Sequence, residues 1–178
     1  PGAARSFQKP DLFTISSDAD RSYRAATHPI SVGQESFERF NRVARGPFMW
    51  KALWWHCYYL QLPTPLTSGN TYSIEVKGID QPHRKQVTFA YDQQQTTSKA
   101  FKINQVGYSS KASNRYAYLG WWAGDQGPVD YGTWKRFHAI DESSGRSVLV
   151  GPIEPRKLQD TSFSGENVYQ LDISTLPS

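Results

Sequence analysis

The chain has 178 residues, and 14% of them are aromatic, with six Trp and ten Tyr but one Met and one Cys. This composition favours β-strands, and no long stretch keeps the 3.6-residue apolar period of a helix. The net charge is +4, but Lys and Arg are scattered and form no run, so we expect no nucleic-acid partner.

Cys57 is the single cysteine, so no intramolecular disulfide can form. No apolar run approaches the roughly 20 residues of a membrane span, and we expect no membrane partner. The sequence opens on Pro1 without a basic segment followed by an apolar one. It therefore reads as a mature or trimmed polypeptide, which is compatible with export of a longer precursor.

The first half of the chain predicts one small β-domain over residues 1–98, of the Ig or fibronectin type. Its first strand is expected at 11–16 and its last at 86–91, before a polar linker at 92–98. Residues 31–43 carry apolar side chains spaced three apart, which indicates a short helix or an irregular loop.

Residues 48–62 hold the densest group of aromatic side chains. If these residues form a strand, alternate side chains point to opposite faces; one face would be apolar, and the other would carry both apolar and polar side chains. We interpret the first set as sandwich core; the alternative use of this strand is a sugar-stacking surface made by the second set. The first set is Trp54, Tyr58, Leu60 and Leu62, and the second is Trp55, Cys57, Tyr59 and Gln61.

Residues 62–72 have the sequence pattern of a turn that joins two strands and is fixed by a tyrosine. An apolar residue is followed by a Gly-Asn turn, and then Tyr72 begins an alternating strand. This pattern predicts a tyrosine corner, in which the phenol hydroxyl bonds to the backbone a few residues upstream.

The second half, residues 99–178, again shows alternating strands separated by polar turns. Between two of these strands, residues 120–132 form a long glycine-rich loop with two adjacent Trp. A turn at 141–146 joins a hairpin. The expected strands are 101–108, 115–119, 134–140, 147–150 and 168–173.

Residues 101–108 read Phe-Lys-Ile-Asn-Gln-Val-Gly-Tyr. This stretch resembles the opening of the N-terminal Ig-like domain of glycoside hydrolase family 9 cellulases. The hairpin at 137–148 and the strand ending at Ile173 look like later parts of the same domain. The resemblance covers 101–173 well and 48–100 more weakly. Residues 118–130 are similar to those of a subgroup in which a further Ig-like module precedes this domain. The resemblance implies two tandem Ig-like β-sandwiches, 1–98 and 99–178, in an all-β protein.

The resemblance also implies the kind of enzyme from which such a domain comes. Family members are bacterial, secreted or periplasmic enzymes that hydrolyse β-1,4-glucans in a helical (α/α)6 barrel following the Ig-like domain. Inverting hydrolysis needs an acid and a base about 6.5–9.5 Å apart. The family base lies in an Asp-Ala-Gly-Asp segment, whereas residues 122–125 read Trp-Ala-Gly-Asp and lack the first Asp. We therefore predict no catalytic residue here, an absent barrel, and a glycoside hydrolase as the parent polypeptide.

Two functions follow from these expectations. The first is a non-catalytic module that stabilises or orients the catalytic domain. The alternative is a stand-alone carbohydrate-binding module that recognises β-glucan or cellulose by stacking aromatic rings on sugar. Trp121 and Trp122 are adjacent, so in an extended loop one would be buried and the other exposed. The candidate sugar-binding residues are Trp121, Trp122, Tyr131 and Trp134.

The sequence carries few signals for a metal site. The four His show no metal-ligand spacing, and no cofactor is expected. Asp125 and Asp130, in an oxygen-rich loop, are candidate calcium ligands. Compared with family domains, the chain ends at Ser178 before the last strands. We therefore expect an open sandwich edge through which another copy or a partner can pair.

Overall fold

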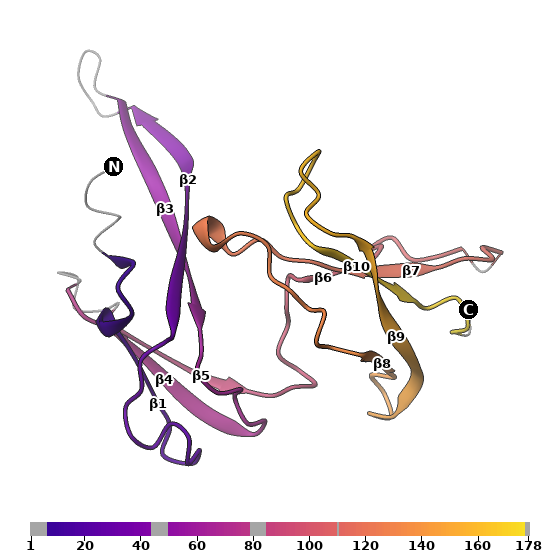
Figure 1. Ribbon diagram of the computed structural model, residues 1–178, viewed down its shortest axis with the longest axis horizontal. Helices are drawn as coiled ribbons and strands as arrows, with labels where there is room; N and C mark the ends of the chain where they lie inside the picture. Colours follow the sequence, from indigo (N-terminus) through magenta and orange to yellow (C-terminus); the bar gives the residue numbers. More distant parts are fainter. Residues whose placement is uncertain (1–6, 44–49, 79–84, 110, 177–178) are drawn as a thin grey trace. The chain divides into compact units, whose positions relative to one another are not determined.

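The computed structural model describes residues 7–43, 50–78, 85–109 and 111–176 (Figure 1). The regular elements there are β-strands and short 3-10 turns, which confirms the all-β class. The described residues contain no helix that is both long and apolar enough to cross a membrane. The chain divides into two compact units: residues 1–97 with Gly124–Gln126, and residues 98–123 with 127–178.

In the first unit, three antiparallel strands form a sheet in the order β1-β4-β5. They are β1 (Phe13–Ser16), β4 (Asn70–Val76) and β5 (Gln86–Tyr91). A 3-10 turn, η2 (Pro10–Leu12), precedes β1. The core of this unit is built on Ile15, Tyr23 and Tyr72, with half-buried apolar side chains around them.

The other sheet of the first unit is a two-stranded antiparallel ribbon of β2 (Ser31–Val43) and β3 (Trp50–Gln61). The expectation of a helix or loop at 31–43 was therefore wrong. The pairing register shifts between Glu38 and Phe40, so a β-bulge adds one residue there. A bulge interrupts the two-residue alternation of a strand, and the interrupted pattern resembled a three-residue period.

Strand β3 has only part of the predicted core face. Tyr58 packs on Phe13, with 5.8 Å between ring centroids, and Leu62 packs against the core. Trp54 was expected in the same set, but it is 55% exposed, so that assignment was wrong. The end of the ribbon where β2 finishes and β3 begins lies beyond the three-stranded sheet (Figure 1). Trp54 lies in that half of β3, and its side chain therefore has no sheet to cover.

The second unit contains one five-stranded antiparallel sheet in the order β6-β7-β10-β9-β8. Its strands are β6 (Phe101–Lys102), β7 (Tyr116–Leu119), β8 (Arg136–Ile140), β9 (Ser147–Lys157) and β10 (Val168–Asp172). The predicted strand at 101–108 is a strand only over its first two residues. Strand β9, in contrast, extends well beyond the 147–150 expected for it.

One face of this sheet is the core of the second unit. It carries Ala117 and Leu119 from β7 and Leu171 from β10, with Trp121 and other half-buried side chains packed around them. Because strand side chains alternate, Tyr116 and Tyr118 lie on the opposite face of β7. Both are half-buried. The strand pattern of residues 116–119 thus separates a core face from an outer aromatic face.

Candidate functional site

The two adjacent tryptophans of the loop lie in different environments. Trp121 packs against the core of the second unit, whereas Trp122 is 37% exposed. The loop is locally strand-like, because Trp122 bridges Pro128 and the Val129 N–H donates to the Trp121 carbonyl. The expected division into one buried and one exposed ring is confirmed. The Trp122 ring leans on Gly165, where an added Cβ would come within 2.9 Å of it.

Tyr131 and Trp134 form a second aromatic pair. Tyr131 is only 8% exposed and belongs to the core, and burial raises the pKa of its phenol. Trp134 is 51% exposed and meets Tyr131 edge to face, with 5.0 Å between centroids. The Tyr131 ring thus supports Trp134 from the core side and is itself covered. Of the four candidate rings, Trp122 and Trp134 face solvent.

The two candidate calcium ligands have protein partners in different units. In the first unit, Asp125 accepts hydrogen bonds from the Gln34 N–H at 2.9 Å and from the Gln8 side chain. In the second, Asp130 accepts from the Tyr169 hydroxyl at 2.6 Å and from the Gly132 N–H at 2.8 Å. Both bonds lower the pKa of Asp130. In the described part of the chain, no three His, Cys, Asp or Glu side chains gather in a way that could hold a metal ion.

The segment that resembles a catalytic motif, residues 122–125, has a packing role. It leads into the 3-10 turn η4 (Gly124–Gln126), which packs on β2 in the first unit. At Gly124, φ is +63° and an added Cβ would lie 2.2 Å from the Gln34 carbonyl oxygen. Only glycine permits that approach. The Asp125 carboxylate then bonds to the same stretch of β2.

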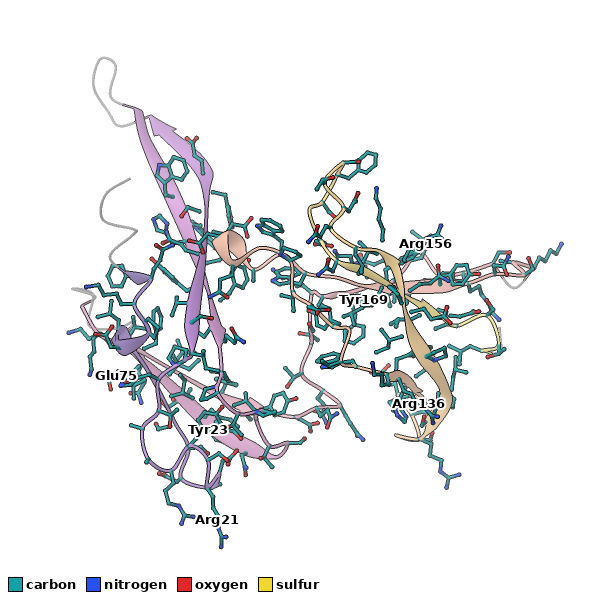
Figure 2. The ribbon with its side chains drawn as sticks, in the orientation of Figure 1. Arg21, Tyr23, Glu75, Arg136, Arg156 and Tyr169 are labelled. Carbon is teal, nitrogen blue, oxygen red and sulfur yellow. The ribbon has the colours of Figure 1, made fainter. Side chains whose placement is uncertain are left out.

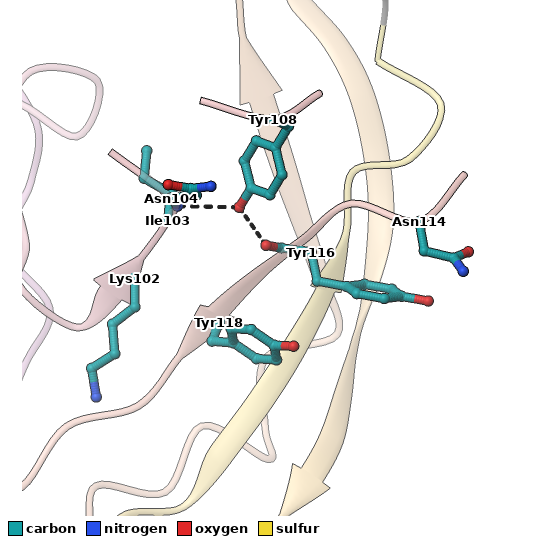
Figure 3. Close-up of a pocket in the computed structure, with 7 residues that line it drawn as sticks. All are labelled: Lys102, Ile103, Asn104, Tyr108, Asn114, Tyr116 and Tyr118. Carbon is teal, nitrogen blue, oxygen red and sulfur yellow. Dashed lines mark hydrogen bonds between the residues drawn. The ribbon is translucent and has the colours of Figure 1, made fainter. Parts of the chain in front are cut away.

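The Asn-Gln-Val-Gly-Tyr stretch closes a loop after β6. Asn104 Oδ1 accepts from the Val106 N–H at 3.1 Å, and Asn104 Nδ2 donates to the Gly107 carbonyl at 2.6 Å. Gly107 has a φ of +98°, which suits glycine. The Tyr108 hydroxyl accepts from the Asn104 N–H and donates to the Tyr116 carbonyl (Figure 3). These side-chain bonds replace strand pairing, which explains why the strand ends at Lys102.

This closed loop forms one wall of a hollow of about 420 Å³ in the second unit (Figure 3). The outer face of β7 forms its floor. The hollow was not predicted, because sequence alternation does not say which face of β7 would be covered. The sequence did contain one sign of an aromatic outer face, because Tyr116 and Tyr118 alternate with Ala117 and Leu119. The polar side chains that line the hollow are Lys102, Asn104, Tyr108, Asn114, Tyr116 and Tyr118.

A Ser–His hydrogen bond occurs on the ribbon of the first unit. Ser36 Oγ lies 2.7 Å from His56 Nδ1, and the Gln34 amide lies 3.4 Å from the same nitrogen. A nucleophilic serine needs a base that a third group orients, usually a carboxylate. Here the Ser36 hydroxyl and the Gln34 amide both contact Nδ1 of His56, so among the described residues this pair lacks the orienting carboxylate. The nearby Glu35 instead accepts from the Tyr59 hydroxyl at 2.9 Å. Burial, together with this hydrogen bond, raises the pKa of Tyr59 to about 12.

Comparison with known proteins gave one result. Residues 96–178 match the family model described as the cellulase N-terminal Ig-like domain. The match confirms the resemblance for the second half of the chain, and it begins two residues before the second unit. No curated protein and no solved structure matched the chain.

Proposed function

We propose that the chain is a non-catalytic accessory module of a family 9 glycoside hydrolase that degrades β-1,4-glucans, because residues 96–178 match the cellulase N-terminal Ig-like domain. In this role it stabilises or orients the catalytic domain. The observation that carries the proposal is the family match, which covers nearly the whole second unit. Because polymeric glucan is found outside cells, the proposal includes a secreted or periplasmic bacterial protein.

The carboxyl groups support a non-catalytic role. A glycosidase acid must keep its proton near neutral pH, so its pKa is raised. Within the described residues, every carboxyl group with a shifted pKa has it lowered, mainly by hydrogen bonds from hydroxyl groups, from backbone N–H groups or from Lys157. These groups are therefore ionised and act as acceptors in turns and between strands. They are Asp20, Asp130, Asp141, Asp160 and Asp172.

The outer face of the β8–β9 hairpin supports contact with another domain. Ile140, Val148 and Val150 are all exposed there, and the pairing of His138 with Val150 places the valines on the face opposite Phe137. Neighbouring exposed apolar side chains commonly mark interaction surfaces. In the described sheet, β8 is also an edge strand. We assign this hairpin face to docking of the catalytic domain.

The test uses the natural polypeptide that carries these residues, compared with a version lacking residues 96–178. We expect the deletion to lower both the thermal midpoint of the catalytic domain and the rate of β-1,4-glucan hydrolysis. Val150→Lys should reproduce part of the loss of stability, and Glu142→Lys in the exposed turn is the matched control. Absence of β-1,4-glucanase activity, or an unchanged midpoint after deletion, would refute the proposal.

A second candidate function rests on the exposed loop tryptophans. Trp122 and Trp134 are partly or largely accessible to solvent, as rings that stack on sugar must be. A stand-alone carbohydrate-binding module would be retained by cellulose or β-glucan. Retention should then disappear in Trp122→Ala or Trp134→Ala, and retention by neither polymer would exclude this role.

A further inference from the structure

We propose that the hollow on the outer face of β7 binds a pyranose ring of a neutral β-1,4-glucan chain. This inference deepens the proposed function and rests on it, because it names the polymer that such an accessory module would hold. It concerns a site separate from the loop tryptophans. Four properties of the hollow support it: its aromatic floor, its uncommitted polar groups, its balanced charge and its preformed wall.

The aromatic floor consists of Tyr116 and Tyr118. They are two residues apart on one strand, so their Cα atoms lie about 7 Å apart on the same face. Both rings are half-buried, and the opposite face of β7 is fixed by core packing of Ala117 and Leu119. In Figure 3 the two rings extend to the same side of the strand. Amphipathic rings of this kind offer apolar area to the C–H faces of a sugar and keep a polar end in water.

The uncommitted polar groups are three. Among the described residues, the hydroxyls of Tyr116 and Tyr118 and the amide of Asn114 make no hydrogen bond to protein. Each group can both donate and accept, as a sugar hydroxyl can. A binding site typically combines apolar walls with a few such groups, in volumes of about 300–1,000 Å³. At about 420 Å³, the hollow is large enough for a monosaccharide unit.

The charge in the hollow favours a neutral ligand. Lys102 is the charged residue of the lining, and its ammonium group forms an ion pair with Glu166. The pair leaves little net attraction for a phosphate or sulfate group. A phosphorylated or sulfated sugar would have to break that pair, whereas a neutral glucan would not.

The wall of the hollow is fixed before any ligand binds. The Asn104 side chain closes its own loop, and Tyr108 attaches that loop to the backbone of Tyr116. A preformed wall lowers the ordering cost of binding. The Asn-Gln-Val-Gly-Tyr stretch would thus hold the wall of the sugar site in place. The side-chain amide of Asn104 would not contact the sugar, because it bonds within its own loop.

The test is affinity electrophoresis of the 178-residue chain in gels with soluble β-1,4-glucan, with titration of cellohexaose to obtain Kd. We expect Tyr118→Ala and Tyr116→Ala each to raise Kd by about two- to tenfold, the effect of losing one ring contact. Asn114→Ala, at an exposed loop position, should also weaken binding without disturbing the sheet. Phe163→Ala removes a ring of the second unit that is 91% exposed and does not line the hollow; it is the matched control and should leave Kd unchanged. Circular dichroism checks that every variant is folded.

Three outcomes would overturn the site. The wild-type chain could fail to bind any β-1,4-glucan, a sulfated polysaccharide could bind more tightly than the neutral one, or binding could survive the Tyr118→Ala and Asn114→Ala changes. Tyr118→Phe keeps the ring and separates its stacking from its hydroxyl. If glucan binding is absent but deletion of residues 96–178 still destabilises the natural enzyme, this site fails and the proposed function stands. Glucan binding by a chain whose parent lacks glucanase activity would overturn the proposed function.

Discussion

Replacing Tyr72 with Phe tests the tyrosine corner of the first unit. Tyr72 is fully buried, and its hydroxyl accepts from the Thr67 N–H at 2.8 Å and donates to Asp20 Oδ2 at 2.6 Å. Its ring packs edge to face on Tyr23 and stacks on Phe89. Phenylalanine keeps these ring contacts and removes only the oxygen. The substitution therefore measures the hydrogen bonds alone.

A buried polar group that loses its partner costs about 1–3 kcal/mol, and we expect Tyr72→Phe to destabilise the first unit by about that amount. For a unit of roughly 100 residues, each kcal/mol lowers the thermal midpoint by about 4–8 °C. A loss of about 2 kcal/mol would then lower the midpoint of the first unit by roughly 8–16 °C.

Differential scanning calorimetry and urea titration at pH 7 measure this change. Tyr91→Phe is the matched control, because Tyr91 packs against the same core and, among the described residues, its hydroxyl has no hydrogen-bond partner. The Tyr72 hydroxyl and the Ser22 N–H lower the pKa of Asp20 below 3.8. Its stabilising effect is therefore full above the unfolded-state pKa and is lost as the pH falls through the lower folded-state pKa.

Tyr72→Phe should consequently reduce the acid sensitivity of the first unit as well as its stability at pH 7. Equal midpoints for Tyr72→Phe and Tyr91→Phe would refute the reasoning, because the corner would then contribute nothing. An unchanged pH dependence in Tyr72→Phe would show that the bond to Asp20 does not lower its pKa.

Four further results are expected. Asp130→Asn should weaken the loss of stability that the second unit shows as the pH falls below 3.8, because Tyr169 and Gly132 lower the pKa of this carboxyl; acid unfolding of both forms measures it. Gly124→Ala should displace η4 from β2, and faster amide exchange at Gln34 would report it. Leu119→Ala in the core should cost about 2–5 kcal/mol by urea titration. The edge strand β8 should support concentration-dependent dimers in sedimentation, and a monomer at every concentration would contradict this.

Local chemistry made the tyrosine corner predictable from sequence. A Gly-Asn turn followed by a tyrosine places the phenol beside the turn, and the bond to Thr67 is confirmed. The second partner of that hydroxyl, Asp20, is 52 residues away and had no local signal. It reaches the corner only through the pairing of β1 with β4.

The errors have local physical causes. The bulge near Glu38 disturbed the alternation of β2, and the side-chain bonds of Asn104 ended β6 earlier than the apolar pattern indicated. In the candidate site, Trp122 and Trp134 could be chosen from the loop composition, but the burial of Tyr131 depends on packing against Tyr169 from β10. The hollow at Tyr118 depends on a loop fold that hydrophobic patterning does not describe.

The assignment of Gly124–Gln126 to the first unit has an evolutionary consequence. Residues 98–178 contain, within one of their loops, a tripeptide that groups with the preceding unit and contacts Gln34 through Gly124 and Asp125. Gene recombination that moved either half alone would leave one unit without its tripeptide and the other with an unmatched insertion. The two units are therefore expected to be inherited together, as a single exchangeable cassette.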